Sequence, residues 1–468
     1  MTEFGKALSF TETAIPGLLI AELPVHGDSR GWFKENWQRE KMIAAGLPDF
    51  GPVQNNISFN DEVGTTRGIH AEPWDKWVSV ATGRIFGAWV DLREGPTFGA
   101  VFTAEIDPSR AIFVPRGVGN SYQTLESDTA YAYLVNDHWS ADAEYSFLNL
   151  ADETVDIQWP IPLSEVEISA KDLAHPRLAD VTPIAPKKTL IVGANGQLGL
   201  ALRESFGDSP RYDYAARDSI DLADPAFISS RRWRDYDTIV NAAAYTAVDL
   251  AETPDGRAEA WASNVTGVAA LARVATEHGI TLVHISSDYV FDGSKDGAYT
   301  EEDAVRPLGV YGQTKAAADA IVSTVPRHYI LRTSWVIGEG KNFVRTMASL
   351  AERGIDPQVV DDQIGRLTFT EDIVAAIEHL LSVTAPSGIY NVTSGGTPLS
   401  WAEIAAQVFA ITGHDSSRVC GVSTQEYFAS SSAPVAPRPR NSVLDLSKLA
   451  STGLSPSDML SRLHAYLA

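Results

Sequence analysis

Residues 189–199, TLIVGANGQLG, constrain the fold more than any other stretch of this chain. A short apolar run leads into three glycines, each three residues after the last, and then into a helical pattern with apolar residues on one face. Glycines at such a turn let backbone N–H groups approach a pyrophosphate at the positive end of the following helix. The stretch therefore predicts a strand, turn and helix that bind a dinucleotide, with contacts from Gly193, Asn195, Gly196, Gln197, Leu198 and Gly199.

The rest of the C-terminal part continues this pattern. Apolar runs at residues 237–245 and 281–291 alternate with helical patterns such as residues 258–279. Strands that alternate with helices indicate a parallel sheet covered on both faces. We therefore expect an α/β fold of the Rossmann type from residue 188 onward.

The N-terminal part has a different pattern. Short runs rich in β-branched and aromatic residues lie at 85–92, 111–115 and 129–135, separated by turn residues. Many short strands with few helical patterns predict an all-β sandwich or jelly roll. A proline-containing segment lies between the two patterns, so we expect domains at 1–175 and 188–468, joined by a linker at 176–187.

Composition excludes several classes of function. The net charge of −23 lacks the basic field that a nucleic-acid partner needs, although a local basic pocket could still bind a small anion. Cys420 is the single cysteine, which excludes an intramolecular disulfide and suits a reducing compartment. No apolar run reaches the length of a membrane span, and the start lacks a basic, then apolar, leader. We expect a cytoplasmic protein with no membrane partner.

Tyr311 and Lys315 are the strongest catalytic candidates in the C-terminal part. Four residues apart in a helix, they lie on one face, where an ammonium favours ionisation of the phenol and proton exchange with a substrate oxygen. Ser287, at the end of an apolar strand, is placed to complete such a site. A surface Lys beside a half-buried Tyr is the alternative. After the predicted second strand, Asp221 would favour NADH through the ribose and Arg217 would favour NADPH through the extra phosphate.

These residues carry a close resemblance. The segments GANGQLG, NAAAYTAVDLAE, ISSDYVFDG, YGQTK and LRTSWVIG occur in order and resemble dTDP-4-dehydrorhamnose reductase, an extended short-chain dehydrogenase. The resemblance implies NADPH or NADH as cofactor, reduction of a C4 ketone, and a small C-terminal substrate-binding part. It implies that Tyr311 donates the proton, that Lys315 lowers the pKa of Tyr311, and that Ser287 binds the ketone oxygen. Further cofactor contacts would come from Ala242, Ala243 and Ala244, and sugar contacts from Val248, Ser286, Tyr289 and Trp335.

In the N-terminal part the segment RGIHAEPWDKW, residues 67–77, gathers polar residues on one predicted strand and loop. With QNNIS, FVPRG and ISAKD it resembles dTDP-4-dehydrorhamnose 3,5-epimerase, a cupin jelly roll. The resemblance implies that His70 is the base, oriented by Asp172, and that Lys76 lies by the enolate oxygen. Without it, a strand histidine that fills a hydrogen-bonding position is the better reading of His70. Nucleotide contacts would come from Arg30, Phe33, Glu35, Gln54, Asn56 and Arg67.

Two positions depart from the epimerase pattern. Asn120 stands where the family has a His, and Trp139 aligns with its catalytic Tyr, although an indole is no general acid near pH 7. His138, Tyr131, Tyr133, Tyr122 or a water could replace that acid. No His-x-His cluster appears in this part, so we expect no metal.

The hypothesis is a fused enzyme that epimerises and then reduces a dTDP-4-keto sugar to dTDP-L-rhamnose, and we expect a homodimer. One alternative is an active reductase with a cupin domain that epimerises partially or with another specificity. Another is a cupin domain that serves as a non-catalytic nucleotide-sugar-binding or dimerising module.

Overall fold

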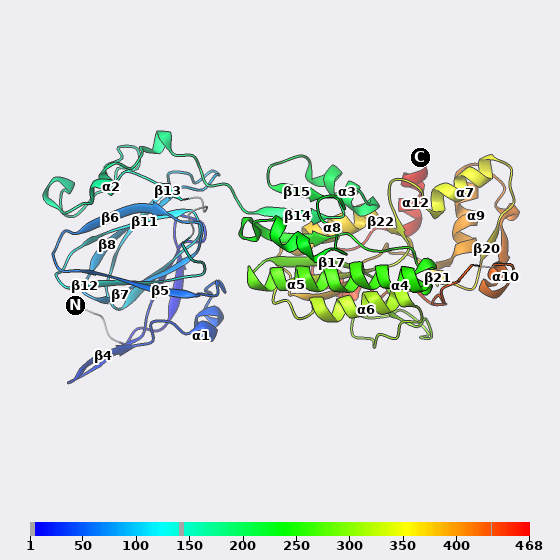
Figure 1. Ribbon diagram of the computed structural model, residues 1–468, viewed down its shortest axis with the longest axis horizontal. Helices are drawn as coiled ribbons and strands as arrows, with labels where there is room; N and C mark the ends of the chain where they lie inside the picture. The colour runs from blue at the N-terminus through cyan, green and yellow to red at the C-terminus, as the bar shows by residue number, and fades with distance from the viewer. Residues whose placement is uncertain (1–4, 140–144, 432) are drawn as a thin grey trace. The chain divides into compact units, whose positions relative to one another are not determined.

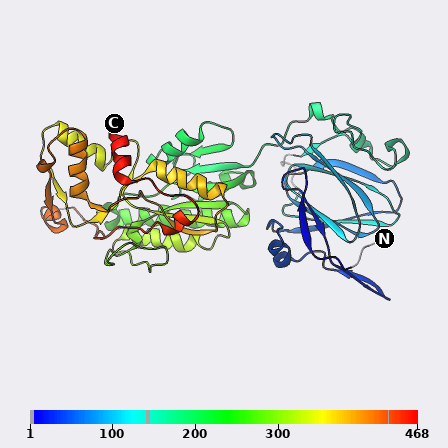
Figure 2. The same cartoon turned by 180° about the vertical axis from the view of Figure 1, so that it is seen from behind.

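The computed structural model describes residues 5–139, 145–431 and 433–468. The chain divides into two compact units, Met1–Pro186 and Lys187–Ala468, and each has its own buried core. Figures 1 and 2 show strands throughout the first unit and a helix-covered sheet in the second. The expected β-rich first part and mixed α/β second part are confirmed.

The N-terminal unit is built from two antiparallel sheets. One has the order β1-β2-β10-β7-β12-β5 and the other the order β13-β6-β11-β8-β9. Their bounds are β1 Ser9–Glu12, β2 Leu19–Glu22, β5 Gln54–Asn60, β6 Thr66–Ala71, β7 Lys76–Thr82, β8 Ile85–Asp91, β9 Val101–Ile106, β10 Arg110–Val114, β11 Val118–Thr124, β12 Thr129–Val135 and β13 Ser146–Phe147. Val78 and Ile112 of the first sheet pack with Trp89 and Tyr122 of the second, so one core fills the space between the sheets.

A hairpin and short helices lie beside the two sheets. Strands β3 (Val25–Asp28) and β4 (Gly31–Lys34) form a separate hairpin, followed by helix α1 (Arg39–Ala44). Figure 1 shows this hairpin projecting away from the two sheets. Helix α2 (Ala170–Leu173) begins at Ser169, whose hydroxyl accepts a hydrogen bond from the backbone N–H of Asp172.

Residues 176–187 differ from the expected linker. Leu178, Val181 and Ile184 are buried in a core cluster of the N-terminal unit, and Ile184 exchanges backbone hydrogen bonds with Leu92 and Glu94. The three apolar side chains pack into the core of the unit. The prolines of the segment had favoured a linker in the sequence analysis. The first unit therefore extends to Pro186.

The C-terminal unit has a six-stranded parallel sheet in the order β15-β14-β16-β17-β18-β23. Its strands are β14 Lys188–Val192, β15 Tyr212–Ala215, β16 Tyr236–Asn241, β17 Thr281–Ser287, β18 His328–Thr333 and β23 Gly388–Asn391. Alternate residues of β14 face opposite sides: Leu190 and Val192 join one core cluster, and Ile191 joins the other. The sheet is therefore buried on both faces, as a parallel sheet requires.

Helices cover the two faces of this sheet (Figures 1 and 2). α5 (Gly267–Glu277) and α6 (Val310–Val322) contribute to the cluster around Leu190, and α3 (Gln197–Phe206) and α8 (Thr370–Ser382) contribute to the cluster around Ile191. Helix α4 (Pro254–Trp261) packs beside α6. A third cluster joins α7 (Phe343–Glu352), α9 (Trp401–Ile411) and α12 (Met459–Leu467) into a small C-terminal part.

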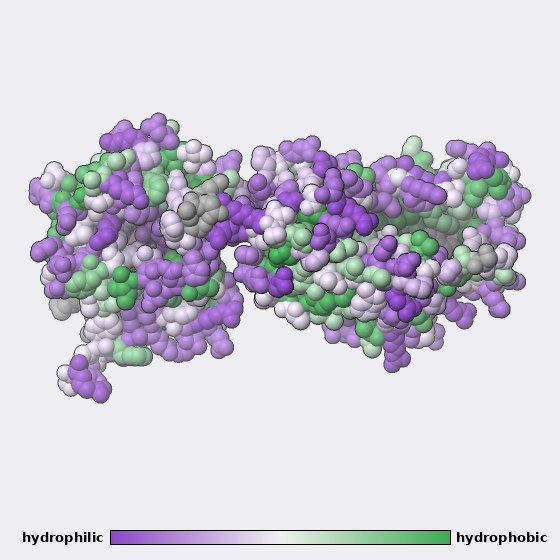
Figure 3. All heavy atoms as spheres, in the orientation of Figure 1, coloured by the Kyte–Doolittle hydropathy of each residue, from purple (hydrophilic) through white to green (hydrophobic). Residues whose placement is uncertain are grey.

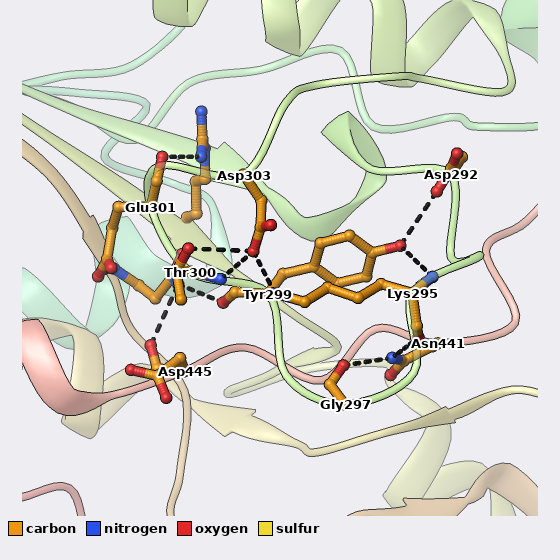
Figure 4. A network of polar contacts seen from close by, with 11 residues as sticks. Asp292, Lys295, Gly297, Tyr299, Thr300, Glu301, Asp303, Asn441 and Asp445 are labelled. Atoms are coloured by element: carbon orange, nitrogen blue, oxygen red, sulfur yellow. Dashed lines mark hydrogen bonds and ion pairs between the residues drawn. The ribbon is translucent and has the colours of Figure 1, made fainter.

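Short elements connect these layers. The remaining strands are β19 Val336–Ile337, β20 Gln358–Val360, β21 Ile364–Gly365, β22 Thr368–Phe369, β24 Leu399–Ser400 and β25 Cys420–Val422, and the remaining helices are α10 Thr424–Phe428 and α11 Ser447–Ser451. Figure 4 shows how the segment after β17 is held against residues 441–445. Tyr299 donates to Asp292 at 3.0 Å, Lys295 pairs with Asp303 at 2.6 Å, and the Asn441 amide donates to the Lys295 carbonyl at 2.8 Å.

No helix among the described residues combines the length and the apolar character that crossing a bilayer would take. Polar and charged residues are spread over the face of both units that Figure 3 shows.

Two candidate active sites

The glycine turn after β14 is shaped by close backbone contacts. Gly193 has φ +86°, and a Cβ there would lie 2.7 Å from the backbone nitrogen of Ala243. A Cβ on Gly199 would lie 2.3 Å from the Gly193 carbonyl oxygen, whereas a Cβ on Gly196 would meet that oxygen only at 3.4 Å. Gly193 and Gly199 therefore make the turn possible, and Gly196 keeps its outer side open.

This turn forms one end of a cavity of about 950 Å³. Of the predicted reductase residues, Gly199 alone is outside the lining, because it faces its own turn. The others that line the cavity are Gly193, Asn195, Gly196, Gln197, Leu198, Arg217, Asp221, Ala242, Ala243, Ala244, Val248, Ser286, Ser287, Tyr289, Tyr311, Lys315 and Trp335. Folding thus brings together residues that lie more than 140 positions apart in the chain.

Ser287, Tyr311 and Lys315 meet in this cavity. Ser287 ends β17, and its hydroxyl donates to Asp288 at 3.0 Å. Lys315, in the second turn of α6, donates from Nζ to the Ile285 carbonyl at 2.5 Å. The helix and the carboxyl end of the strand thereby place a hydroxyl, a phenol and an ammonium around one space.

The electrostatics of these groups differ from the sequence expectation. The pKa of Tyr311 is raised and not lowered, with burial as the largest cause and Asp288 as the next. Burial lowers the pKa of Lys315 to about 8, and burial raises the pKa of Asp288 to about 6. A phenol with a raised pKa holds its proton firmly at neutral pH, which suits a group that gives a proton to a nascent alkoxide.

A second constellation lies in the N-terminal unit. His70, on β6, places Nε2 at 2.9 Å from Oδ1 of Asp172, which α2 carries and which is buried. The backbone N–H of Gly68 donates to the other carboxylate oxygen at 3.3 Å. The carboxylate therefore fixes the orientation of the imidazole.

His70 opens on two cavities that share it and Arg67. One, of about 200 Å³, is also lined by Glu72, Lys76 and Tyr133. The other, of about 400 Å³, is also lined by Asp172. Lys76 is buried and pairs with the Glu72 carboxylate, and its Nζ lies 5.8 Å from the centre of the Tyr133 ring. A base, a cation and a phenol therefore surround the smaller cavity.

Tyr133, one of the candidate replacements for the acid, lines the smaller cavity, whereas Trp139 does not. The Trp139 side chain is 72% exposed and lines neither cavity. Burial raises the pKa of Tyr133, with Glu72 as the next cause, so this phenol is protonated near neutral pH. Tyr122 and Tyr131 also line the smaller cavity, but both are buried and their rings stack on each other.

The remaining acid candidates are already engaged. Tyr131 donates to Asn120 at 3.1 Å, and His138 contacts Gln54 at 2.9 Å outside the cavities. Asn120 thus serves as a hydrogen-bonding partner within the core.

The five other predicted nucleotide contacts do not line either of these cavities in the described part of this chain. Arg30 and Phe33 lie on the projecting hairpin, where Arg30 pairs with Asp28 at 2.5 Å and Phe33 is 66% exposed. Glu35 pairs with Lys41 at 2.6 Å, and Gln54 donates to Asn56 at 2.8 Å. Glu35 directly follows the hairpin, and Asn56 lies on β5 with Gln54.

Comparisons with known proteins match each unit to a family. Residues 12–180 match the family model described as dTDP-4-dehydrorhamnose 3,5-epimerase, and residues 187–468 match the one described as the RmlD substrate binding domain. The chain belongs to both families.

Individual relatives match each unit separately. The epimerase unit is 51% identical over 197 residues to the protein RmlC homolog of Streptococcus pyogenes serotype M6, covering 40% of this chain and 99% of that protein. The reductase unit is 38% identical over 288 residues to a dTDP-4-dehydrorhamnose reductase of Aggregatibacter actinomycetemcomitans. The match covers 58% of this chain and 95% of that protein. A solved dTDP-4-dehydrorhamnose reductase of Bacillus anthracis, in complex with NADP, superposes with a TM-score of 0.55 at 31% identity and covers 60% of this chain and 98% of that one.

The reductase unit also contains a site residue that the sequence analysis missed. Trp401, the first residue of α9, stacks on Trp335 with ring centres 3.8 Å apart, and both rings line the cofactor-sized cavity. The two tryptophans are separated by 66 positions, so no local motif joined them. The pair gives the small C-terminal part a flat apolar surface next to the catalytic residues.

Proposed function

We propose that this chain catalyses two consecutive steps: 3,5-epimerisation of dTDP-4-dehydro-6-deoxy-D-glucose and reduction of the C4 ketone to give dTDP-L-rhamnose. One observation carries the proposal: a single chain of two families holds both a His–Asp pair facing a cation and a phenol, and a Ser–Tyr–Lys group in a dinucleotide-sized cavity. The alternatives of a partial or non-catalytic epimerase unit are not favoured, because these groups of the epimerase unit are intact.

In the epimerase unit His70 removes the proton on a carbon next to the ketone. Asp172 stabilises the imidazolium that forms, and Lys76 offers its charge to the enolate oxygen. Tyr133 returns a proton from the other side of the cavity, so the configuration at carbon inverts. Arg67, whose guanidinium lines both cavities, binds the diphosphate.

In the reductase unit Ser287 and Tyr311 hold the ketone oxygen at C4. Tyr311 gives its proton to that oxygen as the alkoxide forms, and the Lys315 ammonium stabilises the phenolate left behind. The bound cofactor supplies the hydride. The open side of Gly196 and the start of α3 fit its pyrophosphate. Trp335, Val248 and Tyr289 contact the sugar.

NADPH is the cofactor that fits the end of β15. Arg217 is 83% exposed and its Nε lies 3.3 Å from the Asp221 carboxylate, so the guanidinium can turn to a 2′-phosphate at small cost. NADH would place its free ribose hydroxyls by Asp221 instead.

Quaternary structure and location complete the proposal. We assign the two antiparallel sheets to a cupin jelly roll and the protein to a homodimer in the cytoplasm. Exposed apolar side chains support the dimer. Phe33 of the hairpin is 66% exposed, and Ile57 and Phe59 of β5 are 67% and 55% exposed. A second copy covering them would also engage Arg30 and Glu35.

A coupled assay tests the function directly. The full chain receives dTDP-4-dehydro-6-deoxy-D-glucose and NADPH, no other enzyme is added, and oxidation is followed by absorbance. We expect turnover and dTDP-L-rhamnose as product. The control adds a separate epimerase: oxidation that appears only with that addition would reject epimerisation by this chain.

A further inference from the structure

His175 is a buried imidazole to which the proposed reaction gives no role. It follows α2, three residues after Asp172, and its side chain is 5% exposed. Neither ring nitrogen makes a hydrogen bond of normal geometry. The ring of Phe147 stacks on it at 4.8 Å and contacts His70 edge-on at 5.7 Å, so both imidazoles are held in place.

Asp172 is shared between the two histidines. Its Oδ1 lies 2.9 Å from Nε2 of His70 and 3.6 Å from Nε2 of His175. One nitrogen from each ring and one carboxylate oxygen all lie within 4.8 Å of one another. Two imidazoles and a carboxylate are a common ligand set for Zn²⁺ and similar ions. With bonds of about 2.0–2.2 Å, tetrahedral ligand atoms are roughly 3.3 Å apart, which lies between the two separations from Asp172.

The surroundings allow a cation to enter. His70 and Asp172 line the cavity of about 400 Å³, so a fourth ligand position can face water. Asp61, Glu62 and Glu167 also line this cavity, and Arg67 is the cation among its lining residues. Excess negative charge at the entrance raises the local concentration of a divalent cation.

We propose that His70, Asp172 and His175 form a binding site for a divalent transition-metal ion of the Zn²⁺ class, and that the ion inhibits the epimerase unit. The ion binds Nε2 of His70, the nitrogen that faces Asp172, and takes the carboxylate away from its hydrogen bond to the imidazole. A ring that holds a metal ion and lacks this partner accepts the substrate proton less readily on its other nitrogen. Binding rests on the geometry alone, whereas the inhibition rests on the proposed function. No His-x-His motif marks this site, because the ligands lie on β6 and beside α2, about a hundred positions apart.

The test of binding uses the full chain without a histidine tag. Every protein carries Cys420→Ser, because the exposed thiol is another metal ligand. Zn²⁺ is titrated by calorimetry, and Co²⁺ is titrated with its visible absorption as a report of nitrogen and oxygen ligands. We expect one site per chain. His175→Leu lowers the affinity at least about tenfold, since loss of even an outer partner of a ligand costs that much.

Two further variants make the outcome decisive. His26→Leu removes an exposed histidine of β3 and keeps the site. Asp172→Asn weakens the same site from a second position, and circular dichroism checks that each variant folds. Absence of binding, or affinity that neither His175→Leu nor Asp172→Asn changes, would overturn the proposal.

The consequence for activity is measured separately. Zn²⁺ at the concentration that fills the site suppresses coupled turnover and spares reduction of pre-epimerised substrate, and a chelator restores the coupled rate. Undiminished coupled turnover in Zn²⁺-saturated protein would reject the inhibition. If the chain binds Zn²⁺ with the expected variant pattern but never shows epimerisation, the metal site stands and the proposed function fails.

Discussion

Tyr133 and His70 face one cavity from the two different sheets of the N-terminal unit, Tyr133 from β12 and His70 from β6. Inversion at carbon requires a proton to leave on one face and return on the other. A base and an acid on the same sheet would approach the substrate from one side. The two sheets therefore place the base and the acid on opposite sides of the cavity. The role of each can be tested by its own substitution.

Tyr133→Phe removes the proposed acid and keeps the ring. We expect coupled turnover to fall by about 10²–10⁴-fold, because general acid catalysis contributes on that order. His70 still removes protons, so deuterium from D2O enters next to the ketone without inversion. Trp139→Phe is the control and keeps turnover within about twofold, since that ring lines neither cavity. Mass spectrometry follows the exchange, and normal turnover in Tyr133→Phe would reject the assignment.

His70→Ala tests whether the two sites work independently. Coupled turnover is lost, because the proposed base is removed. Reduction of pre-epimerised dTDP-4-dehydrorhamnose with NADPH continues at the wild-type rate, because the reductase unit has its own core and cavity. Simultaneous loss of both activities in a folded variant would contradict the separation.

Tyr311→Phe removes the proton donor of the reductase. We expect the reduction rate to fall by about 10²–10⁴-fold while NADPH affinity, measured by fluorescence, stays near that of the wild type. Tyr214→Phe on β15 is the matched control, because its hydroxyl donates to the Gly207 carbonyl outside the catalytic group. Full reductase activity in Tyr311→Phe would assign the proton to another residue.

Lys315 makes stability depend on pH. Its pKa is about 8 in the folded protein and 10.5 as a free side chain, so unfolding takes up a proton between these values. Stability from this group is therefore gained as pH rises through that window. The Lys315→Met variant lacks this pH dependence. Between pH 7 and 9.5 the free energy of unfolding of the wild type therefore rises by about 2 kcal/mol relative to that of the variant. Urea unfolding followed by circular dichroism measures the difference.

The control for this prediction is Lys341→Met, an exposed lysine of the same unit. Its difference from the wild type stays constant over the same pH range. A Lys315→Met difference that is equally constant would show that burial does not lower the pKa of that amine.

The glycine turn offers a matched pair of substitutions. Gly199→Ala forces a Cβ against the Gly193 carbonyl, so we expect the free energy of unfolding to fall by about 1–3 kcal/mol. We expect NADPH binding to be lost as well, because the turn is distorted. Gly196→Ala has room in the fold, and its methyl group instead weakens NADPH binding with little change in unfolding. Equal unfolding midpoints for the two variants would contradict this account.

Much of the fold and of the reductase site could be predicted from the sequence. Strand and helix periodicity marked the two patterns, and the spacing of Tyr311 and Lys315 placed them on one helical face. Their electrostatics could not be predicted, because the burial that raises the pKa of Tyr311 depends on packing from distant segments. Trp401 escaped notice for the same reason.

The epimerase site shows more clearly which features could not be predicted from the sequence. Alignment by motif placed Trp139 where the family has its catalytic Tyr, and the sequence left His138, Tyr131, Tyr133, Tyr122 and a water as possible acids. Only the pairing of β12 with β7 decides which side chain faces Lys76. The apolar residues of 176–187 were likewise hidden among prolines, although they complete the core of the first unit.

Two self-contained units on one polypeptide have a consequence for gene expression. Each ribosome that finishes the chain makes one copy of each site, so the cell cannot adjust their ratio by transcription or by degrading one partner. Flux through the pair must then be balanced by the turnover rates encoded in the two cavities. A substitution that slows one unit cannot be compensated by making more of that unit alone.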